Sequence, residues 1–366
     1  MNNMAGSALT NLSTAAFSRR GFLAACGMGL AGGVLALSGC GKQQAAASGA
    51  SASGSGSSTA AAGNLKTIRI GMPGDVGKVS FGYNAAVAWK KGIFEKELKK
   101  AGYKPEYTGF PQAGPAINEA FAAKAIDVAQ YSEFPAITIR SKGVDVKAFA
   151  VSDAAQAFAL LATKSSGIQK VEDLKGKKIA TGVGTVQQRY LTLALKKAGL
   201  STSDVQVVNA SAADAPSMVA SKSVDAWACM YQLVYTNAPK IDGTIIASSL
   251  EDPSQATTSN FFARTEYIKD NKDALVAIAR AAKWGYDYAQ KHPDEARQIM
   301  AEIANTNQDA VNAEFKDDSF PTFNPEITDD VKARYQSVEE FLLDNQLIKQ
   351  SVNIDDFVDT SIYKAI

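Results

Sequence analysis

The sequence predicts an α/β protein, on the evidence of its length and of the order of its strand-like and helix-like segments. The chain has 366 residues, of which 46% are hydrophobic and 20% charged. This length suits about two domains or one large bilobed domain. Short β-branched runs alternate with segments of helical spacing between residues 67 and 230. Such alternation is typical of mainly parallel sheets with helices on their faces.

Each predicted element follows from its local pattern. The predicted strands are short apolar or β-branched runs: 67–71, 127–130, 146–151, 158–163, 178–181, 205–208 and 224–230. The predicted helices have apolar residues at helical spacing: 84–100, 116–125, 135–142, 187–198 and 216–221. A mainly helical C-terminal region follows, with helices at 272–291, 293–304, 309–315 and 328–345.

The N-terminal segment has the pattern of an export signal. Two arginines precede an apolar run at 21–37, which is short for a bilayer span, and small residues lead on to Cys40. Residues 18–23 resemble the twin-arginine export motif, and residues 37–40 resemble the lipobox of bacterial lipoproteins. The lipobox resemblance implies that Cys40 is lipidated and becomes the new N-terminus. A plain secretory signal with a chance cysteine is the alternative.

A tether is predicted between this signal, residues 1–40, and the folded body. Residues 41–64 are dominated by Ala, Ser and Gly, a composition that cannot bury a core and that reads as a flexible linker. A lipid anchor followed by such a linker would hold the protein on the extracytoplasmic face of the cell membrane, in the periplasm or at the cell surface.

Composition excludes several classes of function. The 38 Lys and Arg residues balance the 37 Asp and Glu residues, so no excess charge points to nucleic acid. Of the three cysteines, Cys26 and Cys40 lie in the N-terminal segment, which leaves no basis for a disulfide framework or a thiolate metal cage. The single histidine, His292, excludes a multi-histidine metal site and disfavours a Ser-His-Asp triad. We expect no metal and no cofactor.

Several predicted helices begin just after predicted strands. Gly114 is followed by a proline at the expected first helical position. Thr185 and Gln188 have the spacing of a capping box, and Asp214 precedes another helix. In open α/β sheets, ligands bind beyond the carboxyl ends of strands. Helix starts at that edge present free N–H groups and a partial positive charge, so the sequence predicts an anion site there.

Five stretches, in the same order, resemble the solute-binding proteins of ABC importers for aliphatic sulfonates, taurine and nitrate. They are Lys91–Lys96, Gly114–Ala120 leading to Ala125–Asp127, Val171–Ala180, Ala194–Leu200 and Ser223–Trp227. The resemblance extends from about residue 66 to about residue 300. Tyr131–Glu133 and Tyr231–Gln232 depart from the family pattern, which usually has an aspartate at the first place and Asp-Pro at the second.

The resemblance implies a bilobed periplasmic-binding-protein fold of type II. Two mixed sheets flanked by helices would enclose a ligand cleft, and two crossovers would join the lobes. We expect lobe one to combine residues 65–152 with 255–366, and lobe two to span 153–254. The lobes would close on the ligand by a hinge motion. The partners would be a small solute and the membrane subunits of an ABC permease, with the protein itself a monomer.

Eight residues are candidates for ligand contact. They are Gly114, Ser132, Glu133, Thr185, Gln188, Asp214, Trp227 and Tyr231. Alternatively, Thr185 and Gln188 could cap the helix that they begin, and Asp214 could be a negative charge at a helix N-terminus. Glu133 could bind an amine of the ligand or an arginine across the cleft, or it could stabilise a helix start. A carboxylate there favours a zwitterionic or cationic group on the ligand. Trp227 and Tyr231 could form aromatic walls of the pocket or pack in the core.

These features together predict a membrane-anchored receptor that delivers a small anionic or zwitterionic solute, such as an aliphatic sulfonate, taurine or nitrate, to an importer. Three alternatives remain open. The protein could bind a thiamine-pyrimidine-type or other organic solute. It could be an enzyme built on the same fold, because a fold does not fix function. It could also sense a ligand without transporting it.

Overall fold

The structure is a computed structural model that describes residues 64–74, 81–252, 255–303, 305, 308–314 and 324–366. These described residues belong to one compact unit, Ala60–Ile366. The expected signal and tether, including Cys40, lie outside the described residues. Among the described helices, none is long and apolar enough to cross a membrane.

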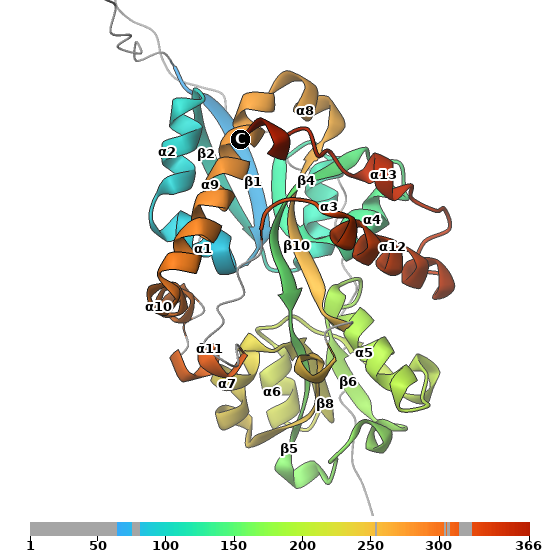
Figure 1. The fold of residues 1–366 in the computed structure, drawn as a ribbon. Helices are drawn as coiled ribbons and strands as arrows, with labels where there is room; N and C mark the ends of the chain where they lie inside the picture. Colours follow the sequence, from blue (N-terminus) through green and yellow to red (C-terminus); the bar gives the residue numbers. More distant parts are fainter. Residues whose placement is uncertain (1–63, 75–80, 253–254, 304, 306–307, 315–323) are drawn as a thin grey trace, which may run out of the picture. The chain divides into compact units, whose positions relative to one another are not determined.

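Two five-stranded sheets form the framework of the fold (Figure 1). The first has the order β2-β1-β3-β10-β4 and the second the order β7-β6-β8-β5-β9. The strands of the first sheet are β1 (Lys66–Pro73), β2 (Tyr103–Phe110), β3 (Val128–Ser132), β4 (Val146–Gln156) and β10 (Thr257–Arg264). Those of the second are β5 (Phe158–Thr163), β6 (Lys178–Thr181), β7 (Gln206–Asn209), β8 (Ala226–Met230) and β9 (Gly243–Ser248).

Both sheets are mixed, which confirms the two mixed sheets that the family resemblance implied; the alternation of strands and helices alone had indicated mainly parallel sheets. In the first sheet β1 pairs in parallel with β2 and β3, whereas β10 pairs antiparallel with β3 and β4. The second sheet repeats this arrangement, with β5 antiparallel to β8 and β9. The chain passes from the first sheet into the second at β5 and returns to the first sheet at β10. Each of these two strands is antiparallel to both of its neighbours in the sheet that it enters.

Helices flank both sheets, and those of the first are the more numerous. They are α1 (Tyr83–Lys90), α2 (Ile93–Lys100), α3 (Gly114–Ala122), α4 (Glu133–Arg140), α8 (Thr265–Asp270), α9 (Lys272–Lys291), α10 (Pro293–Ile303), α12 (Asp329–Asp344) and α13 (Ile354–Phe357). A further helix, α11 (Gln308–Glu314), contacts α10 on one side and α7 on the other. The second sheet carries α5 (Val186–Lys197), α6 (Ala215–Ala220) and α7 (Gln232–Asn237). In Figure 1, α9 lies along α1 and α2, and it packs against both.

The single helix expected at 84–100 is two helices. Gly92 adopts the left-handed conformation, with φ of 68°, which ends α1 and starts α2 in a new direction. The turn lets Phe94 point into the core beside the first sheet. There its ring lies 4.7 Å from that of Phe81 and 5.9 Å from that of Phe261. These aromatic contacts anchor the start of α1, which the next section places at the functional site.

Candidate functional site

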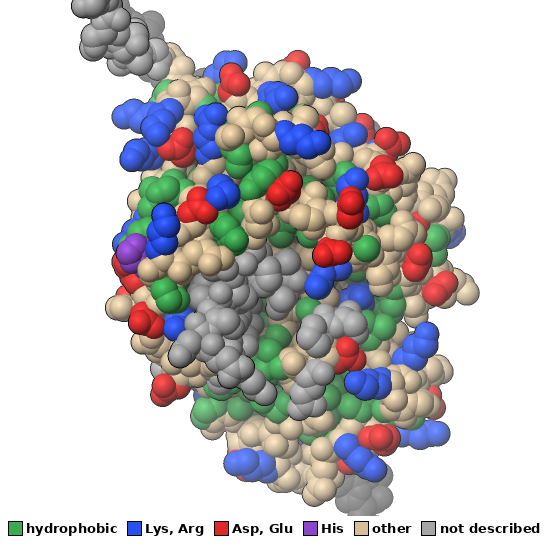
Figure 2. Space-filling model, viewed as in Figure 1, with side chains coloured by type: hydrophobic (Ala, Val, Ile, Leu, Met, Phe, Trp, Pro, Cys, Tyr) green, Lys and Arg blue, Asp and Glu red, His purple; other side chains and the backbone are tan. Residues whose placement is uncertain are grey.

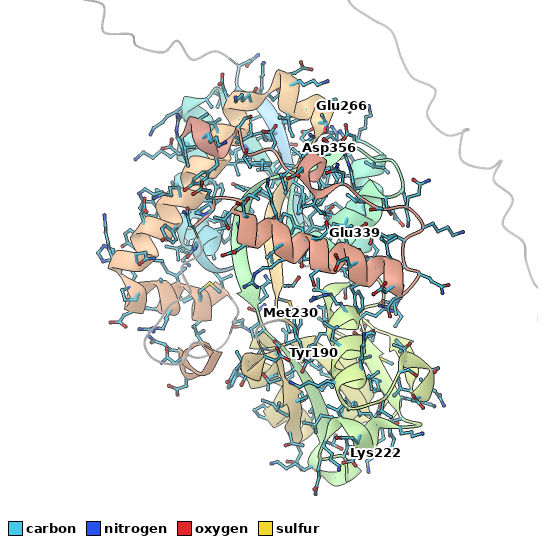
Figure 3. All side chains as sticks on the ribbon, turned by 45° about the vertical axis from the view of Figure 1, so that its right-hand side comes forward. Tyr190, Lys222, Met230, Glu266, Glu339 and Asp356 are labelled. Atoms are coloured by element: carbon cyan, nitrogen blue, oxygen red, sulfur yellow. The ribbon has the colours of Figure 1, made fainter. Side chains whose placement is uncertain are left out.

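A cavity of about 210 Å³ lies where the two sheets meet. Its lining draws on both sheets and on the helices that follow their strands: Pro73, Phe81, Gly82, Ala113, Gly114, Gln130, Tyr131, Ser132, Pro135, Gln156, Thr185, Val186, Gln187, Met230, Gln232, Ser259, Met300 and Ile303. In Figure 3, Met230 lies at the end of β8 that faces the first sheet. The cavity therefore lies in the cleft that the two-sheet architecture predicts.

Four helices begin at this cavity. The N-cap or first residues of α1, α3, α4 and α5 line it, at Gly82, Gly114, Ser132 and Thr185. In none of the four does the N-cap side chain make a capping hydrogen bond. The first N–H groups of a helix have no partner within it, so these four helix starts direct backbone donors and positive dipole ends at one space.

The starts of α3 and α4 lie against each other. A Cβ atom on Gly114 would lie 2.6 Å from Cβ of Pro135, so only glycine fits at this place. The Asn118 amide donates a hydrogen bond of 2.8 Å to the Pro135 carbonyl. The Tyr131 hydroxyl in turn donates to Oδ1 of Asn118 over 3.1 Å. This network fixes the two helix starts relative to β3.

A small polar network forms part of the wall. The Gln130 amide Nε2 donates to Ser152 Oγ over 2.8 Å and to Ser259 Oγ over 2.6 Å. All three residues are buried. Gln130 and Ser259 line the cavity from β3 and β10, so their contact ties the wall to the strand that returns from the second sheet. Gln156, Gln187 and Gln232 add further side-chain amides to the lining.

The remaining wall is apolar. Phe81, Val186 and Met300 are buried, and Met230 and Ile303 are partly buried. Thioether and aliphatic side chains of this kind provide an adaptable surface for a hydrocarbon group. The cavity therefore combines hydrogen-bond donors at the helix starts with an apolar surface.

The described lining contains no Asp, Glu, Lys, Arg or His side chain. Its only titratable group is the Tyr131 phenol, whose pKa burial raises well above the ordinary value. Charged side chains are instead intermingled over the surface shown in Figure 2. An anion in the cavity would be stabilised by dipoles and amide donors, and no carboxylate of the described lining would oppose it.

The structure brings three of the eight candidate residues into this lining: Gly114, Ser132 and Thr185. Thr185 is the N-cap of α5, but its hydroxyl oxygen is engaged locally, 2.6 Å from the Gly182 carbonyl oxygen and 2.5 Å from Oε1 of Gln187. Gln188 stabilises the preceding turn, since its Oε1 accepts a 2.8 Å hydrogen bond from Gly184 N. Gln188 is not among the lining residues.

The other four candidates also lie outside this lining. Asp214 is exposed and accepts a hydrogen bond from Ser211. Trp227 is buried in the core beside the second sheet, where Tyr231 also packs. The Glu133 carboxylate faces β10 and is described further below. Its neighbour Ser132 lines the cavity, but the Glu133 side chain points elsewhere.

Several residues of the lining were not singled out from the sequence: Gln130, Gln156, Gln187, Gln232, Met230, Met300 and Ser259. Gln130 and Met230 each stand at or near the end of a predicted strand, which was an available signal. Ser259 belongs to β10, a strand that had not been predicted, and Met300 comes from α10, far away in the sequence.

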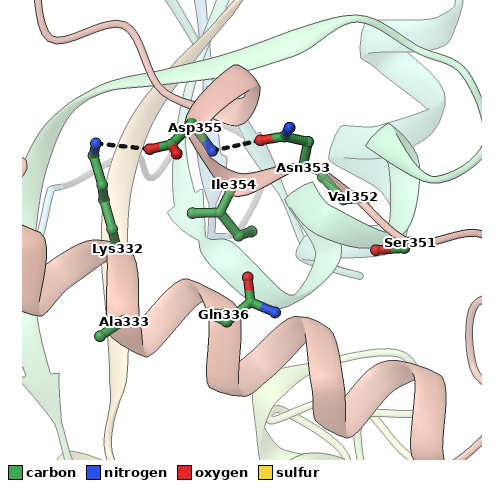
Figure 4. A pocket seen from close by; sticks show the side chains of 8 residues that line it. All are labelled: Lys332, Ala333, Gln336, Ser351, Val352, Asn353, Ile354 and Asp355. Atoms are coloured by element: carbon green, nitrogen blue, oxygen red, sulfur yellow. Dashed lines mark hydrogen bonds and ion pairs between the residues drawn. The ribbon is translucent and has the colours of Figure 1, made fainter.

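Another hollow, between α12 and the loop before α13, has the character of an ordinary surface depression (Figure 4). Lys332 pairs with Asp355 at 2.9 Å, and Asn353 Oδ1 accepts from Asp355 N at 2.9 Å. The charges of Lys332 and Asp355 thus satisfy each other. Across the described residues, no group of three or more His, Cys, Asp or Glu side chains could hold a metal ion.

The NMT1/THI5-like family model matches residues 82–296. This range contains the four helix starts of the cavity. The chain belongs to the NMT1/THI5-like family. A relative from Bacillus subtilis (strain 168), named "Putative aliphatic sulfonates-binding protein", is 28% identical over 301 residues, covering 82% of this chain and 88% of the relative.

Two solved structures extend the family comparison to the fold. The periplasmic aliphatic sulphonate binding protein SsuA from Escherichia coli superimposes with a TM-score of 0.62 at 23% identity, over 81% of this chain and 92% of that one. The desulfurization enzyme DSZB gives a TM-score of 0.64 at 15% identity, over 82% and 98%. This family member therefore has the fold of periplasmic binding proteins, and an enzyme shares that fold.

Proposed function

We propose that the protein is the solute-binding component of an ABC importer and that it captures a small organic anion, with an aliphatic sulfonate as the favoured class. The observation that carries this proposal is the convergence of four uncapped helix starts on one cavity with a neutral lining. The name of the Bacillus subtilis relative supports the choice of sulfonates.

In this proposal the two ends of the ligand meet different walls. The sulfonate oxygens accept hydrogen bonds from the backbone around Gly114, Ser132 and Thr185. The organic group lies against Met230 and Met300. Taurine is disfavoured because its ammonium group would find no carboxylate in the described lining. Nitrate and sulfate would leave the apolar wall unused.

The two lobes would close over the ligand. We propose that residues 65–152 and 255–366 form one lobe and residues 153–254 the other. Both sheets contribute to the cavity lining, which supports this division. Closure would bring Thr185 and Gln187 of the second lobe toward Gly114 and Ser132 of the first, and would present the ligand-bound form to the permease.

Membrane attachment is part of the proposal and is tested separately. With Cys40 lipidated, the 41–64 tether would hold the protein at the outer face of the membrane. The full chain expressed in a bacterial host should fractionate with membranes and incorporate labelled palmitate. The Cys40→Ser variant should lose both properties. Unchanged labelling in that variant would contradict the assignment of the anchor.

The binding function is tested by thermal shift and calorimetry with methanesulfonate, butanesulfonate, taurine, nitrate, sulfate and a thiamine-type pyrimidine. Butanesulfonate should give the largest stabilisation, roughly 2.7 kcal/mol at 100 times its dissociation constant. No response to either alkanesulfonate at millimolar concentration would contradict the proposal. A response to the pyrimidine alone would instead favour a pyrimidine-binding protein.

An enzyme is the second candidate, because DSZB shares the fold. The described cavity lining offers no Cys, His or carboxylate to act as nucleophile or base. Cys229, the one cysteine among the described residues, is buried outside the lining, and burial raises its pKa. Incubation with an aryl sulfinate tests for catalysis: released sulfite would favour the enzyme, and binding without turnover would favour the receptor.

A further inference from the structure

Two oppositely charged side chains, one beside each sheet, line a second cavity of about 360 Å³. Glu133 begins α4, directly after the ligand-lining Ser132, and Arg189 lies one turn beyond the ligand-lining Thr185 on α5. The full lining is Glu133, Arg189, Ala256, Thr258, Ala333, Arg334, Ser337 and Val338. The Glu133 charge therefore lies on α4 and the Arg189 charge on α5, two helices whose first residues line the ligand cavity.

The Glu133 carboxylate is hydrogen-bonded to the first two residues of β10. Its carboxylate accepts hydrogen bonds from Thr257 Oγ1 at 2.6 Å, Thr258 N at 3.1 Å and Thr258 Oγ1 at 2.8 Å. The residue is 1% exposed. Burial raises the pKa of this carboxyl, while the two threonines and the Arg189 charge act in the opposite direction.

Arg189 is also buried, but it is poorly satisfied. Its Nη1 donates to the Gln255 and Ala256 carbonyls at 3.4 Å each, and its Nε has no hydrogen-bond partner among the residues that the structure describes. The guanidinium also lies over the Phe341 ring, 5.8 Å from its centroid. Arg189 and Glu133 influence each other electrostatically without forming a direct ion pair. A buried charge with weak partners is costly, so a closer partner would be strongly favoured.

We propose that Glu133 and Arg189 are positioning residues that form an electrostatic latch between the two lobes. When the lobes close, the start of α5 moves toward the start of α4, and Arg189 crosses the second cavity to pair with Glu133. The pair stabilises the closed form and thereby slows release of the ligand. This inference rests on the proposed function, because the latch acts on the same binding site.

Residues 255–258 lie between Glu133 and Arg189 and contact both of them. Residues 255–258 hold Arg189 by their first two carbonyls and Glu133 by the two threonines that follow. This segment is also where the chain returns from the second sheet to the first. Arg334 of α12 lines the same cavity and is the other cation near Glu133, so the test must separate its contribution.

The first arm of the test measures butanesulfonate binding to the full-length variants Glu133→Gln, Arg189→Met and the double variant. Each single variant should weaken binding about tenfold or more, mainly through faster dissociation. The double variant should be no weaker than the single ones, because the pair acts as a unit. Additive losses, or unchanged affinities, would overturn the latch. Arg189→Lys should restore part of the affinity.

Two control variants sharpen this arm. Lys197 of α5 makes an exposed 3.1 Å ion pair with Asp252, close to the same crossover segment. Lys197→Met should therefore leave affinity within about twofold, since exposed pairs contribute little. Arg334→Met should not abolish the coupling between Glu133 and Arg189. Loss of that coupling would assign the latch to Arg334 and overturn the proposal.

The second arm needs no ligand. Fluorophores attached through unnatural amino acids at the exposed positions of Lys99 and Lys196 report the separation of the lobes by single-molecule energy transfer. Glu133→Gln and Arg189→Met should both shift the ligand-free distribution toward larger separation, whereas Lys197→Met should not. If wild type binds no probe, the proposed function fails, yet this arm still decides the latch: unshifted distributions would overturn it.

Discussion

Gly114 and Pro135 approach so closely that a methyl group on Gly114 would lie 2.6 Å from Cβ of Pro135. Gly114→Ala should therefore push the starts of α3 and α4 apart. We expect a loss of about 1–3 kcal/mol in the free energy of unfolding, from overpacking, together with weaker sulfonate binding. Gly82→Ala is the control, because a Cβ on Gly82 meets nothing within 4 Å. Equal loss of stability in both variants, measured by urea unfolding, would contradict this account.

A negative charge placed in the cavity should repel the ligand. Gln187→Glu adds a carboxylate to the lining at the start of α5, where the helix dipole tolerates it. We expect sulfonate affinity to fall by about 10- to 100-fold, or roughly 1.4–2.8 kcal/mol, with little change in Tm. Calorimetry provides the measurement. The same substitution at the exposed Gln206 should leave affinity unchanged, and tighter binding to Gln187→Glu would argue for a cationic ligand.

The apolar wall predicts a dependence on chain length. Each methylene added to an alkanesulfonate should tighten binding about fourfold, from about 0.8 kcal/mol per buried methylene, until the cavity is full. Met230→Gln should flatten this dependence while retaining affinity for methanesulfonate. Met218→Gln, outside the lining, should preserve the slope. Identical slopes in wild type and Met230→Gln would remove Met230 from the site.

Asp127 predicts a pH dependence of stability. Burial alone would raise the pKa of this carboxyl, but hydrogen bonds from the Arg69 side chain and backbone, with the Arg264 charge, outweigh burial and lower it. The resulting stabilisation is present above the unfolded-state pKa of about 3.9 and is lost as pH falls through the lower folded-state value.

Asp127→Asn should therefore destabilise the fold at pH 7, by about 3 kcal/mol, because Arg69 loses its carboxylate partner and the buried Arg264 loses a neighbouring negative charge. The difference from wild type should shrink as the pH approaches 2. Urea unfolding across this range measures both effects. Asp355→Asn, which breaks only the exposed pair with Lys332, should show a smaller change. A pH-independent gap between wild type and Asp127→Asn would contradict the assignment.

The sequence predicted the helix starts of the site better than its side chains. A glycine-proline pair and a capping-box spacing mark where α3 and α5 begin, and both starts lie at the cavity. Trp227 could not be placed in the same way. Successive side chains of β8 point to opposite faces of the sheet, and the sequence does not say which face is turned to the ligand. Trp227 faces the core because it packs against the helices beside the second sheet.

β10 shows why part of the fold escaped prediction. Its first four residues, Thr257 to Asn260, are polar and yet buried, so they carry no hydrophobic signal. Their burial is stabilised by long-range hydrogen bonds. Asn260 accepts from the Tyr335 hydroxyl at 2.6 Å, and Thr257 donates to Glu133. Such partners, 75 and 124 residues away, become evident only once the tertiary structure is known.

The most direct test of the central claim compares butanesulfonate with butyl methyl sulfone, its neutral analogue of similar size, by calorimetry on the wild-type protein. If backbone donors and dipoles at four helix starts hold an anionic head group, the sulfonate should bind at least about 100-fold more tightly than the sulfone. Equal affinity for the two compounds would show that the cavity recognises shape and apolar surface alone, and would contradict the account.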